Sequence, residues 1–533
     1  MQRPRSLQGA ARYVVSGMGL AAAGFTVYTT WAGVLEPRLQ RALHVLLLVP
    51  MVFLLYPATR RSPQQRPTFW DWAWALVSAA GAAYIALNHR RLAFRYEGIS
   101  PVLPVEVVLG GAMALAVLEG ARRAVSPWLP LTTLVAVAYL ALSRYLPGVL
   151  YYKGFPPERI IEMLYLRGAE GIFGFLMGIS ANLLAIFILF AAFMLHSGLG
   201  RYFMDLATLA AGRFRGGPAK VAVLSSALYG SISGSSVADV YATGSFTIPA
   251  MKRIGYPPWL AAAIEAVASA GGSLMPPIMG AGAFIMAEMT GIPYSRIAVA
   301  AFIPAVLYYI GILWVVHLHA ARLGMRPAAP EDVPRLREVL PKAYYLLPLG
   351  VVVYYLIAGY SPAKAALYGL VASAGVDLLA CGLRPDIRGV AGAVVRAGRS
   401  MVQGAQSAAV IAVALACSGI IVVALTQTGL ALALSSMILK LSGGHLLLAL
   451  FLVLAIVSVL GTGIPTTPAY VITATIAAGA LHQMGVPTLA VHLFIFYYAV
   501  LADVTPPDAV TAFAAAQLAG SDPVVTGFRA PLI

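Results

Sequence analysis

The stretch that decides the fold is Gly230-Ser231-Ile232-Ser233-Gly234-Ser235-Ser236, in the middle of the apolar segment 221–250. Glycine and serine are unfavourable in a helix interior, so a helix that enters this segment is predicted to end at the motif. Basic residues flank the segment on both sides, and such residues collect in the cytoplasmic loops of membrane proteins. A single span would leave one basic cluster on the wrong side, so the segment is predicted to be a re-entrant helical hairpin. The flanking basic residues are Arg213, Arg215, Lys220, Lys252 and Arg253.

The whole chain is too apolar for a soluble enzyme. Of its 533 residues, 60% are hydrophobic and 11% are charged, whereas soluble domains carry about 25% charged residues. A span needs roughly 20 apolar residues, and about twelve spans are predicted in addition to hairpins at 221–250 and 445–484. The spans lie near 13–34, 43–57, 70–87, 102–119, 128–146, 172–195, 259–289, 297–319, 344–358, 365–382, 402–427 and 488–519.

The net charge of +16 is explained by basic loops on the cytoplasmic side of the bilayer, so it does not indicate a nucleic-acid partner. The basic N-terminus is placed in the cytoplasm, and we expect no cleavable signal peptide because no small-residue cleavage site follows it. One basic loop, with Arg90, Arg91 and Arg95, falls outside on this topology. Cys381 and Cys417 lie in apolar surroundings, which excludes a disulfide framework and a Cys-rich metal site.

An internal repeat appears when the sequence is shifted by about 231 residues. Ordered features then coincide, from a small-residue turn through a hairpin tip to a Pro-Pro break. Five predicted spans separate the two hairpins, and this odd number places them on opposite faces of the membrane. The halves, at 172–320 and 402–533, are therefore predicted to be inverted repeats, as in many secondary transporters. The coinciding residues are Gly198 with Gly429, Ser235-Ser236 with Thr466-Thr467, and Pro276-Pro277 with Pro506-Pro507.

The tips and the Pro-Pro breaks are the candidate sites for ions and substrate. Hydroxyl oxygens and freed carbonyls suit a hard cation such as sodium, and helix N-termini favour anions. A carboxylate at membrane depth is a functional candidate, which singles out Asp239 and Asp503, and Glu265 in the first broken span. Other interpretations remain open: helix packing for the first tip, a kink for the second, and a polar contact or helix cap for the aspartates.

Several motifs resemble one family. The runs Gly212–Lys220, Gly230–Ala238, Gly244–Pro249 and Met275–Gly280 resemble the large membrane component of tripartite ATP-independent periplasmic (TRAP) transporters. The resemblance is greatest to the fused permeases of the TAXI subgroup, whose second-half pattern is matched by Gly461–Tyr470 and Thr505-Pro506-Pro507. It covers about residues 165–525. The first 150 residues resemble the small four-helix component only weakly, through hydropathy and Arg41-Ala42-Leu43-His44.

The resemblance implies an elevator-type secondary transporter in a bacterial or archaeal cytoplasmic membrane. It implies a periplasmic solute-binding protein that delivers a small carboxylate, and coupling to sodium at the hairpin tips, or to protons in the TAXI subgroup. It implies neither an organic cofactor nor a catalytic residue. Together with the two aspartates, it gives the candidate ion- and substrate-binding residues Ser233, Gly234, Ser235, Ser236, Asp239, Pro276, Pro277, Gly461, Thr462, Gly463, Thr466, Thr467, Asp503, Thr505, Pro506 and Pro507.

The predicted fold is thus an all-α polytopic membrane protein with two re-entrant hairpins in inverted repeats. Residues 1–150 form a scaffold of four to five helices like the small component. Residues 151–320 form the first repeat with its hairpin on the cytoplasmic side, and 321–401 supply connecting spans and an arm helix. Residues 402–533 form the second repeat with its hairpin on the periplasmic side.

Three other functions compete with this one. An ion channel would use the tips as a filter, but filters are usually built around one axis. A membrane enzyme would need a nucleophile with a base or a metal set, and the sequence has no Walker loop, no Gly-x-Ser-x-Gly and no His/Cys cluster. A stand-alone dicarboxylate elevator carrier would work without a binding protein.

Overall fold

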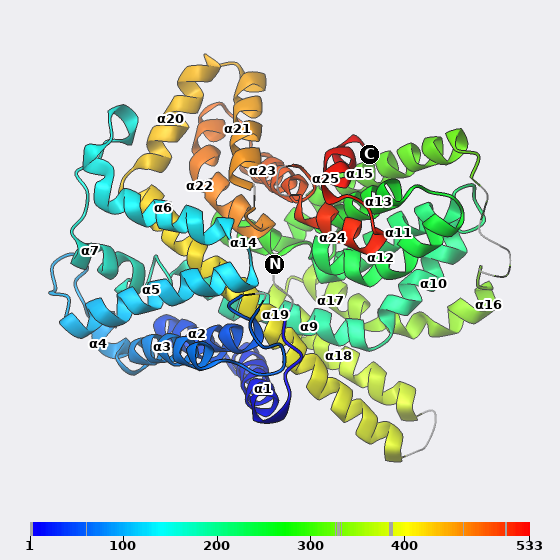
Figure 1. Ribbon diagram of the computed structural model, residues 1–533, viewed down its shortest axis with the longest axis horizontal. Helices are drawn as coiled ribbons and strands as arrows, with labels where there is room; N and C mark the ends of the chain where they lie inside the picture. Colours follow the sequence, from blue (N-terminus) through cyan, green and yellow to red (C-terminus); the bar gives the residue numbers. More distant parts are fainter. Residues whose placement is uncertain are drawn as a thin grey trace. The chain divides into compact units, whose positions relative to one another are not determined.

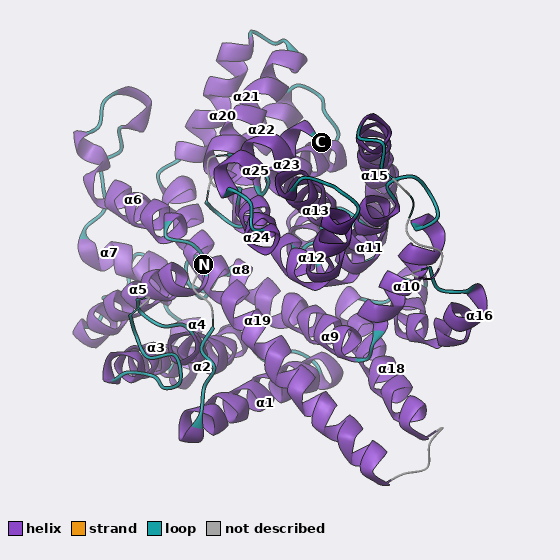
Figure 2. Ribbon diagram, turned by 45° about the vertical axis from the view of Figure 1, so that its right-hand side comes forward, coloured by secondary structure: helices purple, strands orange, loops and turns teal. Residues whose placement is uncertain are grey.

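The computed structural model describes residues 4–59, 61–325, 327, 331, 333–382, 387–461, 463–506 and 509–533. Within these ranges the regular structure is helical and contains no strand, as Figure 2 shows, so the predicted all-α class is confirmed. Seven of the described helices are long and apolar enough to cross a membrane. Other predicted spans correspond to shorter or interrupted helices, and the total of twelve stays a prediction.

The chain divides into two compact units, each assembled from three stretches of sequence. Unit 1 consists of Met1–Ala192, Val395–Val453 and Val471–Val491. Unit 2 consists of Phe193–Val394, Leu454–Tyr470 and His492–Ile533. Each unit therefore contains residues from both halves of the predicted repeat. The predicted domains, in contrast, are continuous stretches of sequence.

Unit 1 contains the N-terminal helices, in which α2 packs against α1, α3 and α5. Its elements are α1 (Gly9–Ala32), α2 (Pro37–Leu55), α3 (Phe69–Leu87), α4 (His89–Ala93), α5 (Pro104–Ala124), α6 (Trp128–Leu142), α7 (Pro157–Ile161), α8 (Phe175–Ile179), α20 (Leu430–Ser442), and most of α9 (Ala185–His196) and α19 (Ile387–Gln427). Short 3-10 or π segments are η1 (Ser143–Tyr145), η2 (Gly148–Leu150), η3 (Glu162–Leu166) and η4 (Ser180–Leu184).

The basic loop that disagreed with the predicted topology is held by ion pairs inside unit 1. Arg91 and Arg95 contact the buried carboxylate of Glu106 at 2.5 and 3.5 Å. Arg95 also lies 3.6 Å from Glu162. Local carboxylates therefore pair with these positive charges, while the side of the membrane on which the loop lies stays a prediction.

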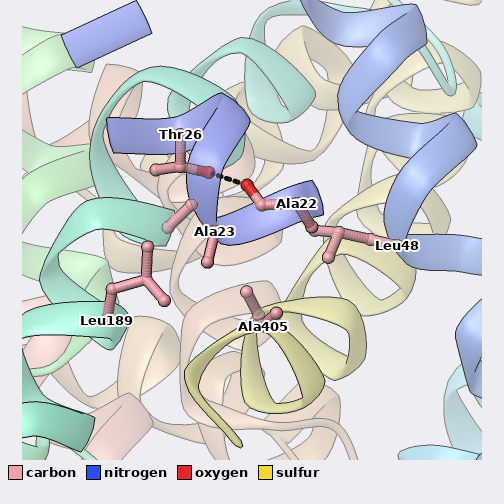
Figure 3. A pocket seen from close by; sticks show the side chains of 8 residues that line it. Ala22, Ala23, Thr26, Leu48, Leu189 and Ala405 are labelled. Carbon is pink, nitrogen blue, oxygen red and sulfur yellow. Dashed lines mark hydrogen bonds between the residues drawn. The ribbon is translucent and has the colours of Figure 1, made fainter. Parts of the chain in front are cut away.

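A small cavity in unit 1 has an apolar wall. Its polar side chain, Thr26, donates its hydroxyl to the Ala22 carbonyl at 2.9 Å within the same helix (Figure 3). Since this hydroxyl is already satisfied, the cavity offers little to an anion or a cation. Its lining residues come from α1, α2, α9 and α19 and are Ala22, Ala23, Thr26, Leu48, Ala185, Leu189, Ala405 and Ala408.

The core of unit 2 is formed by α11, α12, α13 and α24, which pack against one another although α24 lies more than 200 residues further along the chain. In Figure 1 this appears as the red α24 beside the green helices. The elements of this unit are α10 (Leu199–Ala211), α11 (Gly217–Ser233), α12 (Ser236–Arg253), α13 (Pro258–Gly272), α14 (Ala281–Thr290), α15 (Tyr294–Arg322), α16 (Leu336–Val339), η6 (Leu340–Leu346), α17 (Leu347–Ile357), α18 (Pro362–Gly382), α24 (Val510–Ala519), α25 (Pro523–Arg529) and η7 (Ala530–Leu532).

Three further helices are shared between the stretches of the two units: α21 (Leu446–Gly461), α22 (Thr466–Gln483) and α23 (Thr488–Ala502). The chain is interrupted at all four predicted places, between α11 and α12, α13 and α14, α21 and α22, and α23 and α24. At the first interruption Gly234 has φ +60°, a left-handed conformation that glycine adopts without steric cost.

The repeat is visible in the order of the elements. Gly198 and Gly429 precede α10 and α20, and both of these helices have 13 residues. Both glycines have positive φ, +97° and +71°. A helix pair and then an interrupted helix follow in each half. The structure therefore repeats the same sequence of elements, while their inverted orientation stays a prediction.

Candidate functional site

The two hairpin tips meet at one carboxylate in unit 2. The hydroxyl of Ser236 donates to Asp503 Oδ2 at 3.0 Å, and the hydroxyl of Thr466 donates to the same oxygen at 2.7 Å. Thr511 completes the cluster, because its hydroxyl donates to Ser236 Oγ at 3.0 Å and its amide donates to the Asp503 carbonyl at 3.1 Å. One aspartate thus joins the first tip, the second tip and the second helix break.

The sequence places these groups at helix ends. Ser236 is the first residue of α12, and Thr466 is the first residue of α22. Helix N-termini carry partial positive charge and stabilise a nearby carboxylate. Asp503 directly follows α23, which stops before Pro506 because proline cannot continue the backbone hydrogen-bond pattern. Asp503 and Thr466 are half-buried, so the cluster is not sealed from its surroundings.

Asp239 belongs to a different contact of the first tip. The Ser233 hydroxyl donates to Asp239 Oδ1, while Asp239 Oδ2 is buried and has no hydrogen-bond partner among the described residues. Gly230 and Gly272 flank this free oxygen, and a Cβ on either glycine would lie 2.6 Å from it. Glycine is therefore required at both positions to leave room for the carboxyl group.

The first tip packs on the first helix break. The amide of Ile278 donates to the Ser231 carbonyl at 3.0 Å, and the Ser273 hydroxyl donates to the Gly234 carbonyl at 3.3 Å. The peptide bond between Pro276 and Pro277 is cis. The Pro277 carbonyl is freed from helical pairing and accepts from the Tyr294 hydroxyl at 2.9 Å.

The remaining predicted residues lie around these contacts. Ser235 is exposed and caps α12 by accepting from the Ala238 amide at 3.5 Å. The Thr505 hydroxyl, in the turn after α23, donates to the Leu501 carbonyl of that helix at 2.8 Å. Neither side chain joins the Asp503 cluster through these bonds. Gly461 ends α21, Gly463 has φ +70°, and Thr467 and Pro506 are half-buried. Thr462 and Pro507 lie outside the described residues.

Sequence reasoning missed two sets of hydroxyl groups. Thr511 was not predicted, although it is the first hydroxyl residue after the second Pro-Pro pair. Glu265 was recognised as a buried candidate, but its partners Thr243 and Thr247 were not. Those threonines are one turn apart on α12, and this spacing is the signal that points them to a common neighbour.

The chemistry of the site is that of oxygen ligands. Within the described part of the chain, no three His, Cys, Asp or Glu side chains gather as they would around a transition metal. The Asp503 cluster combines a carboxylate with hydroxyl oxygens, and hard cations prefer such ligands. A hydroxyl that donates its hydrogen also keeps lone pairs that can face a cation. The roles of individual ligands stay predictions.

Comparison with known proteins agrees with these features. The model of the family described as tripartite ATP-independent periplasmic transporter, DctM component, matches residues 112–530. A C4-dicarboxylate TRAP transporter large permease protein DctM of Pseudomonas aeruginosa is 35% identical over 205 residues, 37% of this chain and 47% of the relative. An uncharacterized protein of Sinorhizobium fredii is 31% identical over 202 residues, with the same two shares.

A third relative is the isethionate TRAP transporter permease protein DctMQ of Oleidesulfovibrio alaskensis, 28% identical over 37% of this chain and 32% of its own. The chain spans about half the length of the first two relatives. The family model and the two relatives with a stated function describe transport permeases, which confirms the prediction that this is a membrane transporter component and not an enzyme. The chain belongs to the family of the DctM component of tripartite ATP-independent periplasmic transporters.

Proposed function

We propose that the chain is the membrane permease of a tripartite secondary transporter that imports a small organic acid. A periplasmic solute-binding protein delivers the acid, a sodium gradient drives its uptake, and the hairpins move as part of an elevator. The observation that carries this proposal is the convergence of both tips on Asp503 through Ser236 and Thr466. A ligand at this carboxylate is sensed by both halves of the repeat at once.

Sodium is the coupling ion that the Asp503 cluster suits best. The carboxylate supplies the negative charge, and the hydroxyls of Ser236 and Thr466 already lie within 3.0 Å of it. A bound cation replaces these hydrogen bonds with ion–oxygen contacts to the same atoms. Binding therefore requires both tips to be closed on the break, which ties ion occupancy to hairpin position.

The substrate is proposed to be a small carboxylate. Helix α12 and helix α22 begin at the cluster, and their N-termini favour an anion once a cation has neutralised Asp503. The names of the relatives point the same way, because C4-dicarboxylate and isethionate are both small anions. Because the anion is favoured only after Asp503 has been neutralised, sodium is expected to bind before the acid.

The N-terminal part is proposed to serve as the fused small component, as in the TAXI subgroup. The family model begins at residue 112, which leaves α1, α2 and α3 before it. These three helices pack together in unit 1 and would supply a static scaffold in the bacterial or archaeal inner membrane. A stand-alone carrier and a purely proton-driven permease are the alternatives.

Uptake by the purified full chain in proteoliposomes tests the proposal. Labelled succinate is added outside together with a purified solute-binding protein of the same organism, under an inward sodium gradient or an equal choline gradient. We expect accumulation with sodium and binding protein together, and only background when either is left out. Full uptake without the binding protein supports the stand-alone carrier and overturns the tripartite assignment.

A matched pair of variants tests the site. Thr466→Ala removes a hydroxyl from Asp503, whereas Thr475→Ala removes one that donates to the Val471 carbonyl of its own helix at 2.8 Å. We expect Thr466→Ala to raise the sodium concentration needed for half-maximal uptake and Thr475→Ala to leave it unchanged. Equal sodium dependence in both variants would remove the second tip from the ion site.

A further inference from the structure

The carboxyl group of Glu265, also in unit 2, is enclosed by hydroxyl groups. The hydroxyls that donate to it are different from those that donate to Asp503. Glu265 in α13 is fully buried. Thr243 donates to its Oε1 at 2.5 Å and Ser226 donates to the same oxygen at 3.3 Å, while Thr247 donates to Oε2. Gly244 gives the side chain room, because a Cβ there would lie 3.0 Å from the Glu265 Cγ.

Each threonine hydroxyl has a second acceptor in its own helix. Thr243 Oγ1 lies 2.8 Å from the Asp239 carbonyl, and Thr247 Oγ1 lies 3.1 Å from the Thr243 carbonyl. A hydroxyl has one hydrogen to donate and lone pairs with which to accept. Each threonine can therefore either donate to Glu265, or donate to its helix carbonyl and accept a hydrogen from Glu265.

We propose that Glu265 is a reversible proton-binding site whose two charge states are both satisfied by the hydroxyl pair of Thr243 and Thr247. In the ionised state the hydroxyls donate to the carboxylate. One proton from water then adds to a Glu265 oxygen, and the facing threonine turns its hydrogen to its helix carbonyl and accepts the new one. In either state the two threonine hydroxyls and the Glu265 oxygens that face them keep hydrogen-bond partners, and the loss of such partners is what makes a buried charge change costly.

The surroundings of Glu265 contain no cation that would hold it permanently ionised. Within the described ranges, neither Glu265 nor Asp239 forms an ion pair with a basic side chain. Asp239 is also close by, because its backbone carbonyl lies within hydrogen-bond distance of the Thr243 hydroxyl. Its Oδ2 atom is buried and has no hydrogen-bond partner among the described residues.

The other ionisable groups on the elements packed against α12 and α13 do not offset these carboxyls. Tyr308 and Tyr309 of α15 donate to the Val267 and Ala268 carbonyls at 2.9 and 3.0 Å. Helix α24 carries no ionisable side chain, and Arg529 of α25 stacks on Trp259, 4.0 Å from the ring centroid. The remaining groups are Tyr229 and Lys220 on α11, Tyr241, Lys252 and Arg253 on α12, and Tyr294, Arg296, His317, His319 and Arg322 on α15.

Infrared difference spectroscopy on the full chain in liposomes tests the site without relying on transport. Lowering the pH should produce a carboxylic-acid C=O band that is absent from Glu265→Gln. The band should shift in Thr243→Val, because its hydrogen-bond partner is lost, and return towards the wild-type position in Thr243→Ser. Thr290→Val is the control, since Thr290 donates to the Met286 carbonyl within α14 at 2.7 Å. A spectrum in which Glu265→Gln changes no pH-dependent band overturns the proposal.

The functional role rests on the proposed function, and a second measurement separates their failures. Succinate uptake under a sodium gradient is compared with and without an added acid-outside pH gradient. We expect the added gradient to stimulate wild type and the Thr290→Val control, and the stimulation ratio to fall to unity in Glu265→Gln and Thr243→Val. Sodium-driven uptake with a ratio of unity in wild type overturns the proton site alone. No sodium-driven uptake in wild type overturns the proposed function.

Discussion

Fully buried carboxylates have different partners in the two units, apart from the partly exposed Asp205–Lys342 pair of unit 2. In unit 1, Asp71 lies between Arg5 and Arg123 at 2.8 and 2.5 Å, and Glu106 contacts Arg91 and Arg95. In unit 2, Asp239 receives a serine hydroxyl, Glu265 receives one serine and two threonine hydroxyls, and Asp503 receives one of each. Both sets include fully buried carboxylates, Asp71 and Glu106 in unit 1 and Asp239 and Glu265 in unit 2.

The difference separates fixed charges from exchangeable ones. An arginine stays charged, so the pairs in unit 1 are permanent and hold helices together. Hydroxyls are neutral, so they orient a carboxylate without cancelling its charge. The proposed function assigns a mobile cation to Asp503, and the further proposal assigns a proton to Glu265. A unit with arginine pairs suits a static role, and a unit with hydroxyl pairs suits a changing one.

The strongest test of this contrast is the loss of a fixed pair. Asp71→Ala leaves Arg5 buried without its carboxylate and Arg123 with Glu119 alone, and breaking such a buried pair costs about 3–5 kcal/mol. We expect a large drop in the thermal unfolding temperature of the purified chain in detergent. Full stability in this variant would show that the unit 1 pairs are not structural.

The next largest effect is expected at Asp503. Asp503→Asn removes the charge that two hydroxyls orient, and a hydrogen bond to a charged group is worth about 1.5–3 kcal/mol. Sodium affinity, measured as the sodium concentration for half-maximal uptake, should weaken roughly tenfold or more. Thermal stability should change much less than in Asp71→Ala. A variant that unfolds like Asp71→Ala would place Asp503 among the fixed charges.

A smaller effect is expected from one tip hydroxyl. Ser236→Ala removes one of the two hydroxyls on Asp503, a loss of about 1 kcal/mol for a typical hydrogen bond. Sodium dependence should shift by several-fold, in the same direction as in Asp503→Asn. Ser245→Ala is the control, because that exposed side chain donates to the Ala242 carbonyl within α12. Identical sodium dependence of the two serine variants would contradict the assignment.

The smallest effect is expected at an exposed pair of unit 1. Arg122 is 42% exposed and contacts Glu119 at 2.7 Å. Surface pairs contribute about 0–1 kcal/mol, so Arg122→Ala should leave both the unfolding temperature and the sodium dependence nearly unchanged. A drop in the unfolding temperature as large as that of Asp71→Ala would show that this exposed pair contributes as much to stability as the buried pairs.

The helix interruptions could be predicted from the sequence because their causes are local. The glycine and serine run at 230–236 and the Pro276-Pro277 pair break a helix wherever they occur. The local sequence pattern also predicted that Gly198 and Gly429 occupy equivalent turns. In contrast, the hydroxyl partners of Glu265 were missed, because their contact depends on how α12 and α13 pack.

The sequence by itself determined that the chain is helical, apolar and interrupted at four places, since composition, glycine and proline act through the backbone nearby. Only the tertiary structure decided which oxygens meet. Ser236 and Asp503 are 267 residues apart in sequence and 3.0 Å apart in space. A hydrogen bond forms only over a short distance and in a fixed direction, so the partner of each carboxylate is set by the packing of helices and not by the spacing of residues.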